Sequence, residues 1–131
     1  MSRENVEIVR GWIGALNSGD VESILELADP DVQWWNREDD PGPPVMRGHD
    51  AVRRGLAELA ELAELQVEPK EFIEAGEYVV VTIHLVGHGR ASGASFVDDE
   101  VHVFRLRGGK VTEGREYHTK EEALRAAGLS K

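Results

Sequence analysis

The chain has 131 residues, the usual size of one domain, and is long enough to bury a core without disulfides or metal ions. It contains no cysteine, which excludes disulfides, thiolate metal sites and cysteine nucleophiles and is typical of a cytoplasmic protein. Its formal net charge of −10 repels phosphate backbones, its start is charged, and its apolar runs are too short to span a bilayer. We therefore expect neither nucleic acid nor a membrane as a partner.

The chain begins with a helical pattern. Apolar residues recur at spacings of three and four from Val6 to Leu16, which predicts a helix over about residues 4–17. Gly19 suits the left-handed position that ends a helix, and Asp20 suits the N-cap of the next one. We therefore predict a tight joint between two helices.

The second helix should end at Pro30, because the residue before a proline is pushed out of the helical region. The β-prone run over residues 32–36 predicts a short strand with Trp34 and Asn36 on one face. Residues 37–47 contain three prolines and a glycine, so we expect a loop there. The charged stretch at residues 37–40 is interpreted as solvated surface.

After Gly48 the spacing of the apolar residues changes once, from a helical period to a strand period. Apolar spacings of three and four from Val52 to Ala63 predict a third helix. From Gln66 the period is two, which predicts antiparallel neighbours joined by short turns, with strands at about residues 67–74, 77–86, 95–107 and 110–118.

The last hairpin sets which residues share a face. We interpret Gly108 and Gly109 as part of a three-residue loop that places Leu106 opposite Lys110. Counting back in pairs predicts these partners: Phe104 with Thr112, His102 with Gly114, and Glu100 with Glu116. A slip of one residue would turn all of these polar groups outward.

A capping box of Thr119 and Glu122 predicts a final helix that Gly128 closes. Helices first and a long meander afterwards indicate a single α+β domain over residues 1–131, with the helices packed on one face of an antiparallel sheet.

Four segments resemble the landmarks of SnoaL-like proteins of the nuclear transport factor 2-like superfamily. They are Trp12-Ile13-Gly14-Ala15-Leu16-Asn17-Ser18-Gly19-Asp20, Asp29-Pro30-Asp31-Val32-Gln33-Trp34, Arg47-Gly48-His49-Asp50-Ala51-Val52 and Gly109-Lys110-Val111. The resemblance implies a cone of strongly curved sheet wrapped around N-terminal helices, the cystatin-like α+β roll, commonly as a homodimer. The superfamily includes isomerases, cyclases, dehydratases, epoxide hydrolases and binding proteins, so the fold leaves the function open.

The cone implies an internal apolar pocket with a predictable lining. By strand parity, one set of side chains should face the helices: Val79, Val81, Ile83, Leu85, Glu100, His102, Phe104, Leu106, Thr112, Gly114, Glu116 and His118. Opposite them we expect Trp12, Leu16, Trp34 and Asn36.

The resemblance also permits a test against ketosteroid isomerases. Those enzymes hold an oxyanion with a tyrosine and a protonated aspartic acid while a second aspartate shuttles the proton. At the three corresponding places this chain has Trp12, His102 and Asn36. Because an amide has no basic lone pair near neutral pH, we reject that activity.

The remaining polar residues of the expected pocket are capable of proton transfer. We assign His102 as general base or electrophilic donor, Glu116 as its charge partner or as the proton acceptor, and Asn36 as an orienting donor. The substrate-binding residues are then Trp12, Leu16, Trp34, Val81, Ile83, Glu100, Phe104 and His118. A small apolar metabolite, polyketide-like or terpenoid, is the expected ligand.

Each assignment has a plainer alternative. Glu100 and His118 are interpreted as rim residues wetted by solvent, and Trp12 and Trp34 as core. His84 and His88 share a strand face but lie about 13 Å apart, so we predict no metal site and no cofactor. The alternative function is a non-catalytic ligand carrier or dimeric interaction module, which a pocket filled by Trp12, Trp34 and Phe104 would favour.

The outer face of the sheet is mixed rather than polar, which predicts that a second subunit covers it. Its residues are Thr82, His84, Val86, Val101, Val103 and Tyr117.

Overall fold

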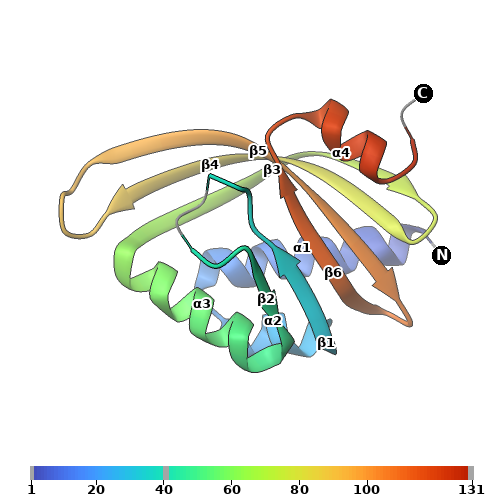
Figure 1. The fold of residues 1–131 in the computed structure, drawn as a ribbon, viewed down its shortest axis with the longest axis horizontal. Coiled ribbons are helices and arrows are strands. Elements are labelled where there is room, and N and C mark those ends of the chain that lie inside the picture. The colour runs from blue at the N-terminus through green and yellow to red at the C-terminus, as the bar shows by residue number, and fades with distance from the viewer. Residues whose placement is uncertain (1, 40–41, 130–131) are drawn as a thin grey trace.

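The computed structural model of the chain describes residues 2–39 and 42–129. In chain order the elements are α1 (Ser2–Ser18), α2 (Val21–Leu27), β1 (Ala28–Trp35), β2 (Val45–Arg47), α3 (Gly48–Leu62), β3 (Ala63–Ala75), β4 (Tyr78–Gly89), β5 (Ser95–Arg107), β6 (Lys110–Tyr117) and α4 (Lys120–Ala126). The predicted α+β class is confirmed (Figure 1).

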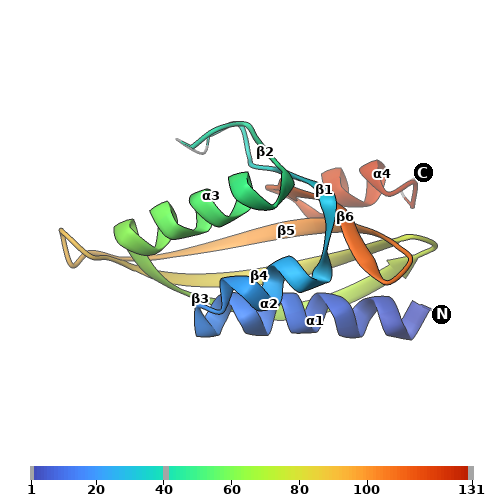
Figure 2. The ribbon, with the colours of Figure 1, turned by 90° about the horizontal axis from the view of Figure 1, so that it is seen from below.

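The six strands form one open, curved sheet in the order β2-β1-β6-β5-β4-β3, with β2 and β3 at its edges (Figures 1 and 2). The strands from β3 to β6 make the predicted antiparallel meander. The expectation of a wholly antiparallel sheet is wrong, because β1 runs parallel to β6. The chain leaves β1 through β2 and α3 and returns beside it only at its last strand, a pairing too distant in sequence for local patterns to reveal.

The joint between the first two helices has the predicted chemistry. Gly19 ends the α1 region with φ of 71°, and the Asp20 side chain accepts a hydrogen bond from the Ser23 backbone N–H at the start of α2. Pro30 lies within the first residues of β1, inside the stretch where pairing with β6 is irregular. A proline costs no ladder hydrogen bond there, so strand β1 starts earlier than predicted.

The expectation that residues 37–47 are all loop is wrong at its end, because Val45–Arg47 forms β2 and pairs with β1. A hydrogen bond of Asn36 brings the loop back beside β1. The Asn36 backbone N–H donates to the Pro44 carbonyl at 3.0 Å, which aligns the two strands. The β-prone Val45 then continues the pairing opposite Trp35.

The last hairpin differs from the predicted register in two places, and their effects on which face the side chains take cancel. Its loop has two residues, Gly108 and Gly109, both at positive φ as a type I′ turn requires, so Arg107 rather than Leu106 pairs with Lys110. That change alone would reverse every side chain beyond the turn.

A bulge at Thr112 restores the original faces. Leu106 pairs with Val111, but Arg105 pairs with Glu113, so Thr112 is the extra residue, and its hydroxyl donates to the Arg105 carbonyl at 3.2 Å. The predicted partners are therefore wrong and the predicted faces right. The observed pairs beyond the bulge are Phe104 with Gly114 and His102 with Glu116.

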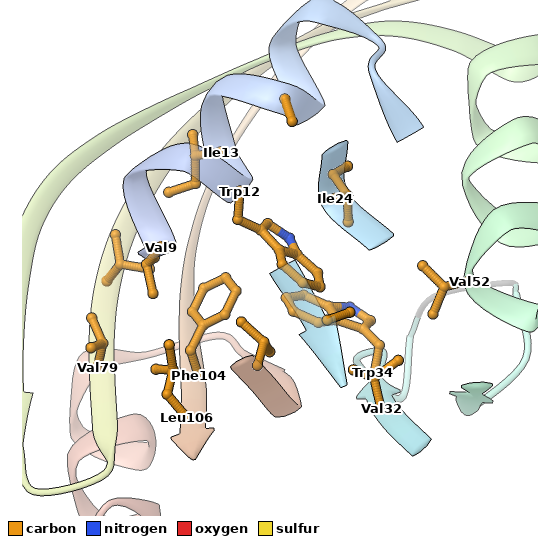
Figure 3. Packing of buried hydrophobic residues seen from close by; sticks show 14 of the residues in the cluster. Val9, Trp12, Ile13, Ile24, Val32, Trp34, Val52, Val79, Phe104 and Leu106 are labelled. Atoms are coloured by element: carbon orange, nitrogen blue, oxygen red, sulfur yellow. The ribbon is translucent and has the colours of Figure 1, made fainter. Parts of the chain in front are cut away.

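The main core fills the space between the concave face of the sheet and helices α1, α2 and α3 (Figure 3). Its centre is aromatic, with Trp12 from α1, Trp34 from β1 and Phe104 from β5. Val52 brings α3 into the same cluster.

A smaller apolar cluster lies on the other face of the sheet, where α4 packs apart from the other three helices (Figure 1). Ala123 of α4 packs with Val80, Val101 and Val103, and Tyr117 lies against them. The chain's own last helix thus covers part of the face that the sequence assigned to a second subunit.

Candidate functional site

Three polar side chains meet on the concave face of the sheet. Glu100 and His102 are two residues apart on β5, and Glu116 lies on β6 directly opposite His102. A nitrogen of His102 and one carboxylate oxygen of each glutamate all lie within 4.8 Å of one another. His102 is 8% exposed, and the rings of Trp34 and Phe104 lie beside it. We call these three residues the acid–base cluster.

The imidazole of His102 is bonded to Glu100. Its Nε2 lies 2.9 Å from Glu100 Oε1. Because a carboxylate only accepts hydrogen bonds, Nε2 is the donor, and Nδ1 holds the free lone pair when the ring is neutral. Glu100, which the sequence interpretation had placed among the substrate-binding residues, thus bonds the imidazole directly.

Trp34 connects the acid–base cluster to the aromatic core. Its Nε1–H donates to Glu116 Oε2 at 2.7 Å. Its ring meets that of His102 edge-on, with centroids 5.3 Å apart and planes at 79°. Trp34 thus anchors one carboxylate and also packs against the imidazole.

Arg37 joins the cluster from the loop after β1. Its guanidinium lies 3.0 Å from Asp98, 3.3 Å from Asp39 and 3.7 Å from Glu100 Oε2. The interpretation of residues 37–40 as solvated surface is wrong at Arg37, whose side chain is only 15% exposed. The excess of carboxylates on the concave face was the available signal for this residue. Buried carboxylates are costly without a cation nearby, so a basic side chain was to be expected there.

The electrostatics keep Glu100 ionised. Burial raises the pKa of its carboxyl group, but the hydrogen bond and charge of His102 and the charge of Arg37 lower that pKa by more, so it lies below the ordinary value. Arg37 shows the same balance with the opposite sign: burial lowers its pKa, and the nearby Glu100, Asp98 and Asp39 raise it above the ordinary value.

Two of the predicted site residues point elsewhere. The Asn36 amide donates to the Pro43 carbonyl at 2.9 Å and holds the loop that returns to β2. His118 is exposed just beyond the end of β6, with its Nε2 3.2 Å from Asp39. The rim interpretation of His118 matches this position, whereas Glu100, with a side chain 12% exposed, is more buried than a rim residue.

The predicted aliphatic lining is in place on the concave face. Val81 pairs with His102 and Ile83 with Glu100 on the neighbouring strand, and both side chains are buried. Leu16 of α1 packs against the same core from the helix side.

The aromatic side chains occupy the interior that an open pocket would need (Figure 3). Trp12 and Trp34 are stacked with centroids 5.8 Å apart, and the Phe104 ring meets them edge-on at 5.6 Å and 5.4 Å. Two surface hollows lie away from the acid–base cluster, one beside Tyr117 and α4 and one between Met46 and α3.

The acid–base cluster has the donor atoms of a metal site as well, one imidazole nitrogen and two carboxylate oxygens. The sequence interpretation considered only pairs of histidines and missed this set. The signal was a single histidine with one carboxylate two residues away on its own strand and another on the same face of the next strand.

None of the helices in the described residues is long and apolar enough to cross a membrane.

The fold and this cluster define an α+β roll with acid–base groups against an apolar interior. The profile of the SnoaL-like domain matches residues 9–114. The chain belongs to this SnoaL-like family, within the nuclear transport factor 2-like superfamily. No curated protein matches it.

Solved structures agree over nearly the whole length. An NTF2-like protein from Burkholderia xenovorans LB400 is 32% identical, with 97% of this chain and 98% of that chain covered and a TM-score of 0.80. TerC, co-crystallised with polyporic acid, is 25% identical, covers 95% and 98% of the two chains, and has a TM-score of 0.80. SalBIII, an epoxide hydrolase/cyclase-like enzyme in pyran ring formation in salinomycin, shares the fold at 22% identity, with 90% and 92% covered and a TM-score of 0.76.

Proposed function

We propose that the chain is a cofactor-independent enzyme that moves a proton on a small apolar metabolite, with His102 as the base. The observation that carries this proposal is the imidazole of His102, which is 8% exposed, meets the Trp34 ring edge-on and lies 2.9 Å from Glu100. A buried carboxylate bonded to an imidazole is costly to keep unless it is well satisfied or used, and buried titratable groups of this kind are enriched at functional sites.

The bonding of His102 defines the chemical step. The Nδ1 lone pair takes a proton from a C–H or O–H group of the substrate, and the Glu100 carboxylate stabilises the imidazolium that forms. The imidazolium then returns the proton to a different atom of the substrate, which completes an isomerisation or cyclisation, or to a leaving hydroxyl, which completes a dehydration. Glu116, held by Trp34, is the second group able to exchange a proton.

Two neighbours support a small-molecule ligand. TerC was crystallised with polyporic acid, and SalBIII acts in pyran ring formation. These names support a small organic molecule as the ligand of this chain, bound beside the apolar side chains of Trp12, Trp34 and Val81.

The alternative is a non-catalytic ligand carrier or interaction module. The observation that favours it is the stacking of Trp12 on Trp34, with Phe104 packed against both, which fills the interior. In that case the acid–base cluster is structural, and the outer face of the sheet is the functional surface.

Native mass spectrometry of the purified chain tests for a co-purified small molecule, and polyporic acid serves as a defined probe through quenching of tryptophan fluorescence. Turnover of the identified ligand is then compared between wild type, His102→Ala and His84→Ala. His84 is the matched control, because it is also bonded to a carboxylate, Asp99, at 2.8 Å but lies on the outer face.

We expect His102→Ala to lower the turnover rate on the order of 100-fold, the usual contribution of a general base, and His84→Ala to leave it unchanged. Equal turnover in wild type and His102→Ala would remove the catalytic proposal. A ligand that binds without being converted would favour the carrier.

A further inference from the structure

The geometry of the acid–base cluster points to a second capacity: we infer that Glu100, His102 and Glu116 bind a divalent transition-metal ion such as Zn²⁺ or Co²⁺. The three side chains offer one imidazole nitrogen and two carboxylate oxygens, all within 4.8 Å of one another. Imidazole and carboxylate together suit these ions better than Mg²⁺, which prefers oxygen ligands alone.

The distances are close to those of a bound ion. An ion with bonds of about 2.0–2.2 Å holds neighbouring ligand atoms roughly 3.4 Å apart. His102 Nε2 and Glu100 Oε1 are already 2.9 Å apart. The Glu116 oxygen lies no more than 4.8 Å from the other two ligand atoms, so a side-chain adjustment of at most about 1.4 Å would bring it to this spacing.

Each carboxylate is held by a neighbour outside the cluster, as the carboxylate ligands of metal sites are. Trp34 donates to Glu116 Oε2 at 2.7 Å. Arg37 lies on the Oε2 side of Glu100, which leaves Oε1 turned toward His102. The ion would therefore lie on the side of Glu100 away from the guanidinium.

The local charge also favours a cation. Two carboxylates meet at the cluster, and the guanidinium of Arg37 beside Glu100 is shared with Asp39 and Asp98. A divalent ion between Glu100 and Glu116 would neutralise both carboxylates in a site where solvent contributes little screening.

Three protein ligands leave further coordination positions for water or for an oxygen of a ligand. An ion coordinated by His102 and Glu100 would replace the hydrogen bond on which the proposed proton transfer depends. The metal-bound form would then be inactive in that reaction. Metal binding is measured without any substrate, so its failure and the failure of the proposed function are separate results.

The full chain, stripped with a chelator, is titrated with Co²⁺ and followed by visible absorption, and Zn²⁺ is then used to displace the Co²⁺. We expect one equivalent to bind. His102→Ala and Glu116→Gln should each weaken binding at least about tenfold. Glu116→Gln keeps an oxygen that accepts the Trp34 hydrogen bond, so it tests the ligand charge with the fold preserved.

His84→Ala is the control, since it removes a histidine bonded to a carboxylate at a similar distance on the other face. Its affinity for Co²⁺ should equal that of wild type, and circular dichroism confirms that each variant is folded. Binding that is unchanged in both His102→Ala and Glu116→Gln, or weakened equally in His84→Ala, would overturn the inference. So would the lack of saturable binding in wild type.

Discussion

The indole ring of Trp34 lies over the α-carbon of Gly114, its partner on the parallel strand β6. A Cβ atom at Gly114 would overlap the Cζ3 and Cε3 atoms of that ring. The missing side chain is what allows the indole to approach β6 closely and to reach Glu116, two residues further along. Gly114 therefore determines how the aromatic core meets the acid–base cluster.

Gly114→Ala should destabilise the protein by about 1–3 kcal/mol, because the new methyl group overpacks a core with little room to relax. Urea denaturation measures the change in the free energy of unfolding. Gly14→Ala is the matched control: no atom lies within 4 Å of a Cβ at this helical position, so we expect a gain of about 0.5–1 kcal/mol. If the two alanine variants were equally stable, the contact between Trp34 and Gly114 would not be restrictive.

Trp34→Phe should cost about 2 kcal/mol, because it removes a hydrogen bond to a partly buried carboxylate. Trp35→Phe provides the comparison on the next residue, since the Trp35 Nε1–H is buried and has no hydrogen-bond partner in the described structure. Its loss removes an unsatisfied donor and should cost clearly less than the loss at Trp34. A larger cost at Trp35, measured in the same urea series, would mean that the bond to Glu116 adds little.

Asn17 ties the end of α1 to the edge strand β3. Its amide donates to the Val67 carbonyl at 2.8 Å, and its carbonyl accepts from the Val67 N–H at 2.7 Å. Asn17→Ala leaves both backbone groups unpaired and should cost about 1–3 kcal/mol. Hydrogen exchange at the Val67 amide should also become faster.

Ser18→Ala is the control for Asn17, because the Ser18 hydroxyl bonds only carbonyls of its own helix at an exposed position. We expect a change within about 0.5 kcal/mol. Unchanged exchange at Val67 in Asn17→Ala would show that the amide is not needed to protect this edge.

Much of the fold could be predicted from local patterns, and the reasons are visible in particular residues. Local patterns predicted three features: the apolar stripe on α1, the joint at Gly19 and Asp20, and the period-two strands. Each of them depends on residues that are neighbours in sequence. The parallel pairing of β1 with β6 and the bulge at Thr112 depend on packing between distant segments. Local rules have no access to either.

The acid–base cluster shows why parity was a better guide than register. Glu100, His102 and Glu116 were placed on one face although both the turn and the pairing were mispredicted, because two shifts of one residue leave the faces unchanged. The position of Arg37 could not be found in this way. Arg37 lies in an irregular loop, where no sequence period predicts which way a side chain points.

The outer face of the sheet remains the surface on which we expect a homodimer to form. Helix α4 covers Val101 and Val103, but Val97, which pairs with Val86 on the same face, is 67% exposed. An interface there would bury this apolar pair. Light scattering across micromolar concentrations should then give about twice the monomer mass of 14.5 kDa.

Val97→Lys should shift this equilibrium toward the monomer, because a dimer would bury the new charge without a partner. Leu62→Lys is the control, since Leu62 is equally exposed, at 68%, but lies at the end of α3. A monomer mass for wild type at every concentration would contradict the dimer. Equal dissociation by both lysines would place the interface elsewhere, because only Val97 lies on the outer face. A dimer weakened by Val97→Lys alone would mean that α4 and the second subunit divide that face between them.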